Sequence, residues 1–382
     1  MQKKLIAAAI AGLIAVPVMA QTNVTISGRM ATGWESYKLS GGKGVNGYDT
    51  ESKVSDQSSR VIFNVVEDLG NGLSAWGQWD LRWSPVDSRL GGDGNSGLGL
   101  MSKSWGKFTM GKWDVHYQEF DANIGGNRAG TLQTLLGNGL MSQVNGNSIA
   151  SGTRTPNLLM WDSPNWGGVT ARLAYSTSFT NDEGQTNRGT GNPGAGRAWT
   201  GALRYNNAGL ALGASYWNGN QEDRAFRAAG TLSATDPGNL RTIDQRSWRL
   251  WGGYTFGFGL KVGLGYDRSS LKNNPFVGNS TTNKRSAWFL PVSYEFGANK
   301  VYFTYAKAGD ASNTVGDTGA KAYVLGYDYA FSKRTSAGVF YTKLKNNNAG
   351  SYDLFALGAN GASATNAGED VRQIYFGVAH NF

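Results

Sequence analysis

The sequence predicts an all-β protein, and more specifically a sixteen-stranded antiparallel transmembrane β-barrel. Apolar and polar residues alternate with a period of two along most of the chain, for example over residues 73–83, 260–267 and 323–331. Short turns alternate with long polar loops, and the chain ends at Phe382 inside an alternating segment. Strands with one apolar and one polar face, joined by connections of alternating length, are typical of a barrel in a lipid bilayer.

The first twenty residues form a segment of a different kind. A basic start is followed by an apolar stretch over residues 5–16 and by small residues before Gln21. This pattern predicts a secretory signal peptide over residues 1–20, which leaves residues 21–382 as the barrel.

Composition argues against several other classes of protein. The 382 residues include no Cys and two His, so a zinc site is not expected, and neither is any other metal or cofactor. No run of eighteen apolar residues occurs, which excludes a helical membrane span. The net charge of +9 is spread along the chain without a basic block, so no nucleic-acid partner is expected.

Seven short turns and eight long loops separate the predicted strands. The turns are rich in Gly, Asn, Pro and Ser, and they lie at residues 70–72, 104–106, 164–168, 207–209, 257–259, 297–299 and 332–334. The loops are polar and rich in Gly and Asn, and they lie at about residues 38–57, 84–97, 114–152, 181–196, 219–241, 271–284, 309–319 and 347–369. These connections join sixteen strands.

The polar rows of the strands distinguish a membrane barrel from a soluble β-sandwich, which would also alternate. These rows consist mostly of small and hydrophilic residues, as a water-filled interior requires. Within a bilayer only a closed barrel satisfies every backbone amide, so the first and last strands must pair with each other. A chain that ends inside its last strand meets this requirement.

Three stretches carry a resemblance to a known family. They are SSRVIFNVVEDLGNGLSAWGQWD (residues 58–80), GKFTMGK (106–112) and NLLMWDSPNWGGVTARLAYS (157–176). In this order they resemble the second and third strands, the strand entering the third loop, and the following hairpin of the general diffusion porins of Gram-negative outer membranes. The resemblance is strongest to the neisserial and β-proteobacterial branch.

The resemblance implies a homotrimer of barrels whose third loop folds into the lumen and narrows it. It implies passive diffusion of small hydrophilic solutes, contact with outer-membrane lipid and lipopolysaccharide, and a terminal Phe382 that the barrel-assembly machinery reads. Four residues match the cations of the family's constriction wall: Arg29, Arg60, Lys112 and Arg154.

Strand parity gives a separate test of these four positions. Arg29, Arg60 and Arg154 fall on the polar rows of their strands, so their side chains should point into the lumen. Lys112 shares its row with the apolar Met110, and it reaches the lumen only if the preceding glycine breaks the register.

The charges that accompany this wall predict the ion selectivity. Arg82 and Arg172 should add inward cations, whereas the acids of the third loop come early, at Asp114, Glu119 and Asp121. A narrow passage with more positive than negative charge predicts mild anion selectivity. The alternative is that each Arg is held by a carboxylate or a carbonyl and contributes shape alone.

Other functions remain open at this stage. A substrate-selective channel would have the same fold, and the inward Trp76 with Trp113 could stack on sugars. An outer-membrane enzyme such as a lipase is disfavoured by the two His, and the thirteen Trp leave room for a secreted carbohydrate-binding β-protein. Aromatic residues near strand ends should instead form girdles at the membrane interfaces: Trp34, Trp83, Trp105, Trp166 and Trp217.

Overall fold

The computed structural model describes most of the chain beyond the predicted signal peptide. The described residues are 22–41, 50–88, 90–91, 94–125, 131–152, 154–179, 196–222, 241–275, 279–355 and 366–382. Residues 1–20 lie outside them, so the signal peptide stays a prediction. Within these ranges, no helix is long and apolar enough to cross a membrane.

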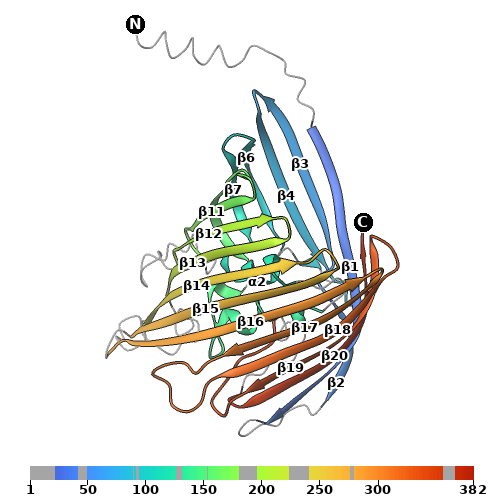
Figure 1. The fold of residues 1–382 in the computed structure, drawn as a ribbon. Coiled ribbons are helices and arrows are strands. Elements are labelled where there is room, and N and C mark those ends of the chain that lie inside the picture. The colour runs from blue at the N-terminus through green and yellow to red at the C-terminus, as the bar shows by residue number, and fades with distance from the viewer. Residues whose placement is uncertain are drawn as a thin grey trace.

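Sixteen antiparallel strands close into a barrel, which confirms the predicted fold class (Figure 1). Two of them are interrupted once: β2 (Glu51–Asp56) continues as β3 (Arg60–Gly70), and β5 (Leu90–Gly91) continues as β6 (Ser96–Ser102). The others are β1 (Thr22–Gly41), β4 (Leu73–Trp83), β7 (Gly106–Trp113), β10 (Thr155–Asp162), β11 (Val169–Ser176), β12 (Ala198–Asn207), β13 (Leu210–Glu222), β14 (Arg241–Thr255), β15 (Leu260–Pro275), β16 (Thr281–Phe296), β17 (Asn299–Ala308), β18 (Ala320–Ala330), β19 (Thr335–Asn346) and β20 (Glu369–Asn381).

The barrel closes between its first and last strands. One edge of β1 pairs with β3 and β2, and the other edge pairs with β20 from Arg29 opposite Asn381 to Gly41 opposite Glu369. Beyond β20, the backbones of Phe382 and Gly28 exchange hydrogen bonds of 2.9 and 3.1 Å. The last residues of the chain therefore complete the ring of strands.

The two faces of the wall follow the predicted alternation. Large apolar side chains such as Val24, Leu203 and Leu325 are exposed on the outside. The exposed Trp166 lies in the turn before β11, whereas the exposed Trp34 lies well inside β1 rather than near its end. Trp217 corrects the predicted girdle. Its side chain points inward and is fully buried, its indole N–H is 3.1 Å from Gln245 Oε1, and its ring meets Phe179 edge-on.

The short turns lie where predicted, but several long connections are shorter than expected. Strands β13 and β14 extend into the predicted loop 219–241, β15 and β16 into 271–284, and β1 and β2 into 38–57. Polar alternation continues in these extensions, and an antiparallel ladder satisfies their backbone amides without needing an apolar face.

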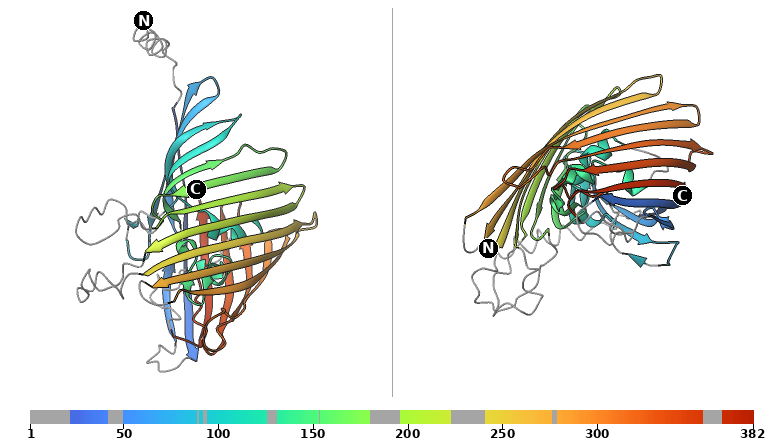
Figure 2. Two further views of the ribbon diagram at one scale, coloured as in Figure 1. Left: turned by 90° about the vertical axis from the view of Figure 1, so that its left-hand side faces the viewer. Right: turned by 90° about the horizontal axis from the view of Figure 1, so that it is seen from below.

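The third loop joins β7 to β10 and consists of short elements. These are η1 (His116–Gln118), α2 (Glu119–Asn123), η2 (Leu132–Thr134), η3 (Leu140–Ser142), the hairpin of β8 (Gln143–Val144) and β9 (Asn147–Ser148), and η4 (Ala150–Gly152). Its elements contact β12, β13, β15, β16, β17 and β19, and Figure 2 shows this green segment beside the inner face of the wall. Residues 350–355 lie against it, where Ser351 N donates to Asn145 Oδ1 at 3.0 Å.

Part of the interior is packed with apolar side chains, which the mostly small and hydrophilic polar rows did not predict. Phe120 and Ile124 of the third loop pack in one apolar cluster with the wall residues Trp251, Phe289 and Phe340. The ring of Phe120 stacks on that of Phe289 with centroids 5.6 Å apart. The third loop is thus held against β12–β19, and a separate group of cations lies on the inner face of the remaining strands.

Candidate functional site

A group of cations lines the inner face of the first half of the barrel, and we name it the basic cluster. It comprises Arg29, Arg60, Arg82, Lys107, Arg154 and Arg172. Strand register brings three of them into a row, since Arg29 lies opposite Arg60 and Arg60 lies opposite Arg82. Like charges directly opposite each other across a sheet are unfavourable, so the row needs carboxylates or solvent nearby.

Asp80 is the carboxylate that this row shares. Its Oδ2 atom is 2.9 Å from Arg82 Nη2 and 3.7 Å from Arg60 Nη1. Asp80 lies two residues before Arg82 on the same face of β4, so the strand period itself places the acid beside both guanidiniums. The Arg60 side chain remains 26 % exposed, which leaves its charge partly in water.

Asp114 connects the start and the end of the third loop. Its Oδ1 atom is 3.6 Å from Arg154 Nε and accepts a hydrogen bond from the Tyr117 hydroxyl. Its backbone carbonyl accepts a hydrogen bond of 2.8 Å from Arg172 Nη1, whose Nε is 2.6 Å from Asp162 Oδ1. Arg172 therefore has two partners and matches the alternative in which an arginine contributes shape.

The six cations interact with one another through space. Arg60 interacts electrostatically with Arg29 and Arg154, and Arg82 interacts with Arg60 and Arg154. Three carboxylates form ion pairs or lie in register with the cluster: Asp80, Asp114 and Asp162. The cluster consequently carries a positive surplus.

Lys107 lies against Trp76 and Trp113, the two aromatic residues that the sequence suggests as a stacking surface for sugars. Its ammonium lies 3.2 Å from the ring centroid of Trp76 and 5.0 Å from that of Trp113. Trp76 is buried, and its indole N–H donates to the Phe108 carbonyl at 3.1 Å. Since a cation already covers the ring, Trp76 is a poor platform for a flat solute.

The other two predicted acids of the third loop have partners away from the basic cluster. Glu119 Oε2 accepts a hydrogen bond of 2.8 Å from Arg204 Nε on β12. Asp121 lies inside the loop, where its Oδ2 accepts from the Asn138 backbone at 2.7 Å. Burial raises the pKa of Asp121 to about 7. Of the three acids expected to face the basic wall, only Asp114 is shown paired with one of its predicted cations.

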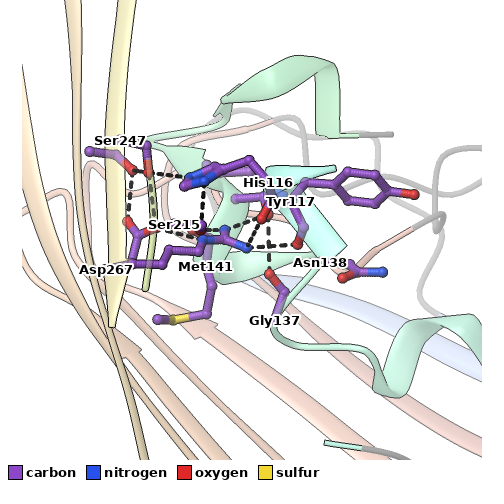
Figure 3. A network of polar contacts seen from close by, with 12 residues as sticks. His116, Tyr117, Gly137, Asn138, Met141, Ser215, Ser247 and Asp267 are labelled. Atoms are coloured by element: carbon purple, nitrogen blue, oxygen red, sulfur yellow. Dashed lines mark hydrogen bonds and ion pairs between the residues drawn. The ribbon is translucent and has the colours of Figure 1, made fainter. Parts of the chain in front are cut away.

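A second polar group, the anchor network, holds the third loop to the opposite wall (Figure 3). Its centre is Asp267, whose Oδ2 is 2.8 Å from Arg249 Nε and whose Oδ1 is 2.7 Å from Arg285 Nη1. All three side chains are fully buried. A buried ion pair is tolerable only when its remaining donors are also satisfied.

Carbonyl groups of the third loop satisfy most of those donors, although Arg285 Nε has no hydrogen-bond partner among the described residues. Arg249 donates to the carbonyls of His116, Tyr117 and Met141 at 3.1, 2.7 and 3.0 Å. Arg285 donates to the Met141 carbonyl at 3.0 Å and also to that of Gln143. The two arginines therefore act as clamps on the loop.

His116 is a further part of the anchor network. Its Nδ1 is 2.9 Å from Ser215 Oγ and its Nε2 is 2.8 Å from Ser247 Oγ. Burial and the neighbouring Arg249 hold the pKa of His116 well below its usual value, so the ring is neutral. Both ring nitrogens are engaged, which suits an anchor rather than a catalytic base.

Comparison with known proteins identifies the family. The chain matches the family described as Gram-negative porin over residues 7–349. The chain belongs to the Gram-negative porins.

Curated relatives of this porin come from two genera. An outer membrane porin protein of Bordetella pertussis is 27 % identical over 387 residues, covering 91 % of this chain and 95 % of the relative. The major outer membrane protein P.IB of Neisseria lactamica is 28 % identical over 365 residues, covering 88 % and 91 %. The porin is accordingly a passive diffusion channel across the outer membrane, and its resemblance to neisserial and β-proteobacterial porins is confirmed.

Solved structures share the fold of this porin. An anion-selective porin from Comamonas acidovorans superposes with a TM-score of 0.69 at 20 % identity, covering 95 % of this chain and 100 % of that one. The trimer form of OmpT of Vibrio cholerae gives 0.65 at 15 % identity, with 94 % and 99 % covered. At these identities the likeness concerns the barrel itself.

Sequence reasoning missed several charged residues of the porin's interior. Arg204, Arg249, Asp267 and Arg285 all lie on the polar rows of their strands, so the parity test applied to Arg29 would have found them. Their partners are scattered along the third loop, which has no periodic pattern to place it.

Lys112 stays a prediction as a residue of the porin's pore. Its pairing with Ser96 of β6 belongs to a register that continues without a shift through Gly97–Gly111. The register shift next to β7 lies on β10, between Thr155 and Leu158. The expected break before Lys112 is therefore absent on the β6 side.

Proposed function

We propose that this porin is a general diffusion channel with mild anion selectivity, set by the basic cluster at its narrowest section. The observation that carries this proposal is the opposed row of Arg29, Arg60 and Arg82, which stability alone does not favour. With the third loop packed on β12–β19, solutes pass beside this row. Its field raises the local concentration of anions.

The porin works as a homotrimer in this proposal, exported by a signal peptide over residues 1–20 and assembled through Phe382. It carries out no reaction and needs no cofactor. The buried His116 has both ring nitrogens held by serine hydroxyls and is therefore unsuited to act as a general base, which supports the absence of a reaction.

The variant Arg60→Gln tests the selectivity. Asp80 keeps Arg82 at 2.9 Å, so the wall should remain intact while one partly exposed charge is lost. We expect the chloride-to-potassium permeability ratio to fall about twofold, given one charge acting through water and salt. The measurement is the reversal potential of single channels in a KCl gradient.

Lys333→Gln provides the matched control, because this exposed lysine lies on the short turn 331–334 away from the cluster. An Arg60→Gln channel with the same reversal potential as the control would refute the role of Arg60. Saturable block of the conductance by a single solute would favour a substrate-selective channel instead.

A further inference from the structure

Cations also lie directly opposite one another on the outside of the barrel. On β17, β18 and β19, Lys307 lies opposite Lys321, and Lys321 lies opposite Lys345. On the neighbouring strands β19, β20 and β1, Lys343 lies opposite Arg372, and Arg372 lies opposite Lys38. We name these six residues the cationic belt: Lys307, Lys321, Lys345, Lys343, Arg372 and Lys38.

The belt lies on the outer surface at the long-loop ends of five adjacent strands. Each member shares its row with an exposed apolar residue, as Lys307 does with Phe303 and Lys321 with Leu325. Figure 1 shows β17–β20 side by side, and β1 completes the group through its pairing with β20. The belt therefore faces what surrounds the barrel, not the pore.

In the part of the chain that the structure describes, few acidic groups balance the charges of the belt. Among the described residues, none of its side chains forms an ion pair or a hydrogen bond. Asp370 interacts electrostatically with Lys345 and Lys343, but one carboxylate stands against six cations. Inside the barrel, by contrast, Arg249 and Arg285 share Asp267. Opposed like charges disfavour the sheet unless an external anion bridges them.

Tyrosines locate the belt relative to the membrane. Tyr305, Tyr323 and Tyr341 lie on the outward rows two residues from Lys307, Lys321 and Lys343, toward the barrel middle. The rings of Tyr323 and Tyr341 have centroids 6.0 Å apart. Tyrosine prefers the boundary between acyl chains and headgroups. The lysines just beyond it are therefore at the depth of the headgroups.

We propose that the cationic belt binds the phosphorylated headgroups of anionic lipid in the outer leaflet, which is lipopolysaccharide in a Gram-negative outer membrane. Phosphate oxygens accept charge-assisted hydrogen bonds from ammonium and guanidinium groups. A phosphate between two opposed lysines relieves their repulsion and holds the lipid at a defined place on the wall. The inference rests on the outer-membrane location of the porin and not on its ion selectivity.

The test compares a belt variant with a matched control. The belt variant is Lys307→Gln, Lys321→Gln, Lys345→Gln, and the control is Lys103→Gln, Lys333→Gln, Arg334→Gln at exposed short turns, with the same loss of charge. Folded protein in neutral detergent is titrated with bisphosphorylated lipid A, with dephosphorylated lipid A, and with inorganic phosphate.

We expect the belt variant to bind bisphosphorylated lipid A on the order of 100-fold more weakly than the control, since each surface cation contributes comparably. The single variant Lys321→Gln should lose about fivefold, which keeps the test available if the triple variant folds poorly. Dephosphorylated lipid A should not distinguish the proteins, and salt should weaken binding of the phosphorylated form.

Three outcomes would overturn the proposal. Equal binding of bisphosphorylated lipid A by the belt variant and the control would remove the belt as its site. Inorganic phosphate binding as tightly as the lipid would indicate a site for soluble anions. Loss of trimers with lipid binding retained would make the belt a subunit contact.

Conductance measurements distinguish the proposal that the cationic belt binds lipid from the proposal that the basic cluster sets the ion selectivity. In a bilayer of neutral lipid the belt variant should keep the permeability ratio of the unmodified porin. Arg60→Gln should keep the affinity for bisphosphorylated lipid A. Each proposal can thus fail without the other.

Discussion

Single residues of the interior show how charge is buried at tolerable cost. Asp267 lies between Arg249 and Arg285 and also accepts hydrogen bonds from Ser269 at 2.7 Å and Ser247 at 3.2 Å. Each carboxylate oxygen of Asp267 therefore has two donors, and most of the remaining N–H groups of the two arginines donate to the third loop. Removing one member would leave a buried charge exposed to an apolar surrounding.

Strand parity explains which residue roles were predictable. Parity alone placed Arg29, Arg60 and Arg82 on the inner face, because side chains alternate strictly along a strand. It could not show that Glu119 pairs with Arg204, since that contact depends on how an aperiodic loop folds. The girdle assignment of Trp217 rested instead on its place near a predicted strand end, and it was wrong because the row of Trp217 faces inward.

Asp121 gives a pH prediction at the same scale. Its pKa in the folded loop is about 7 against a usual 3.8 because it is buried, so the folded state holds the extra proton between these values. The stability of the loop should therefore fall as pH rises from about 4 to about 7, and should be flat above. The total loss of stability is a few kcal/mol, because each unit of pKa shift corresponds to about 1.4 kcal/mol.

Asp121→Asn should remove this dependence and make the loop firmer at pH 8, because the amide oxygen can still accept from Asn138 N. Open-channel current noise between pH 5 and pH 8 reports the loop's fluctuations. Asp68→Asn, at the exposed end of β3, is the control and should keep the slope. A persistent slope in Asp121→Asn would assign the effect to another group.

Among the elements, the third loop depends most on tertiary contacts. Its helices have three to five residues, too short to be stable alone. Apolar packing of Phe120 and Ile124 and the clamps of Arg249 and Arg285 determine where it lies. The strands, in contrast, follow from alternation and turn residues, so their order and number were predictable while the path of this loop was not.

Arg249→Met tests the clamp. Asp267 would keep Arg285, but the loop carbonyls of His116, Tyr117 and Met141 would lose a donor, at a cost of about 3 kcal/mol. We expect faster hydrogen exchange over residues 132–144 and a larger, noisier conductance.

Arg246→Met is the matched control, because it removes an arginine from the outward row of the same strand. It should leave both exchange and conductance unchanged. A quiet channel with normal exchange in Arg249→Met would show that apolar packing alone holds the loop.

The whole barrel is asymmetric. The third loop and residues 350–355 cover the inner face of β12–β19, whereas the basic cluster lines β1, β3, β4, β7 and β11. Closure was predictable from one feature of the sequence, the strand that ends at Phe382. The asymmetry was not predictable, because it depends on which part of the wall the third loop packs against.

Closure itself depends on a glycine at the seam. Both Gly28 and the control position Gly77 lie on outward rows, but a side chain at Gly28 would meet the Phe382 ring at 2.4 Å and the Arg60 carbonyl at 2.5 Å. At Gly77 the nearest atom is 3.7 Å away. Gly28→Val should therefore disturb the pairing of β1 with the chain end, whereas Gly77→Val should be tolerated. The yield of heat-modifiable, folded protein on refolding into detergent measures this.

Restoring room at the seam separates a steric effect from loss of strand propensity. If the Phe382 ring is what the valine strikes, then Gly28→Val combined with Phe382→Ala should refold in vitro better than Gly28→Val alone, although the Arg60 carbonyl still limits the recovery. In cells the same double variant should accumulate poorly if Phe382 is also the assembly signal. Equal refolding of Gly28→Val and Gly77→Val would instead mean that the strands around Gly28 can shift to accommodate a side chain. Barrel closure would then not depend on the close contact between Gly28 and Phe382.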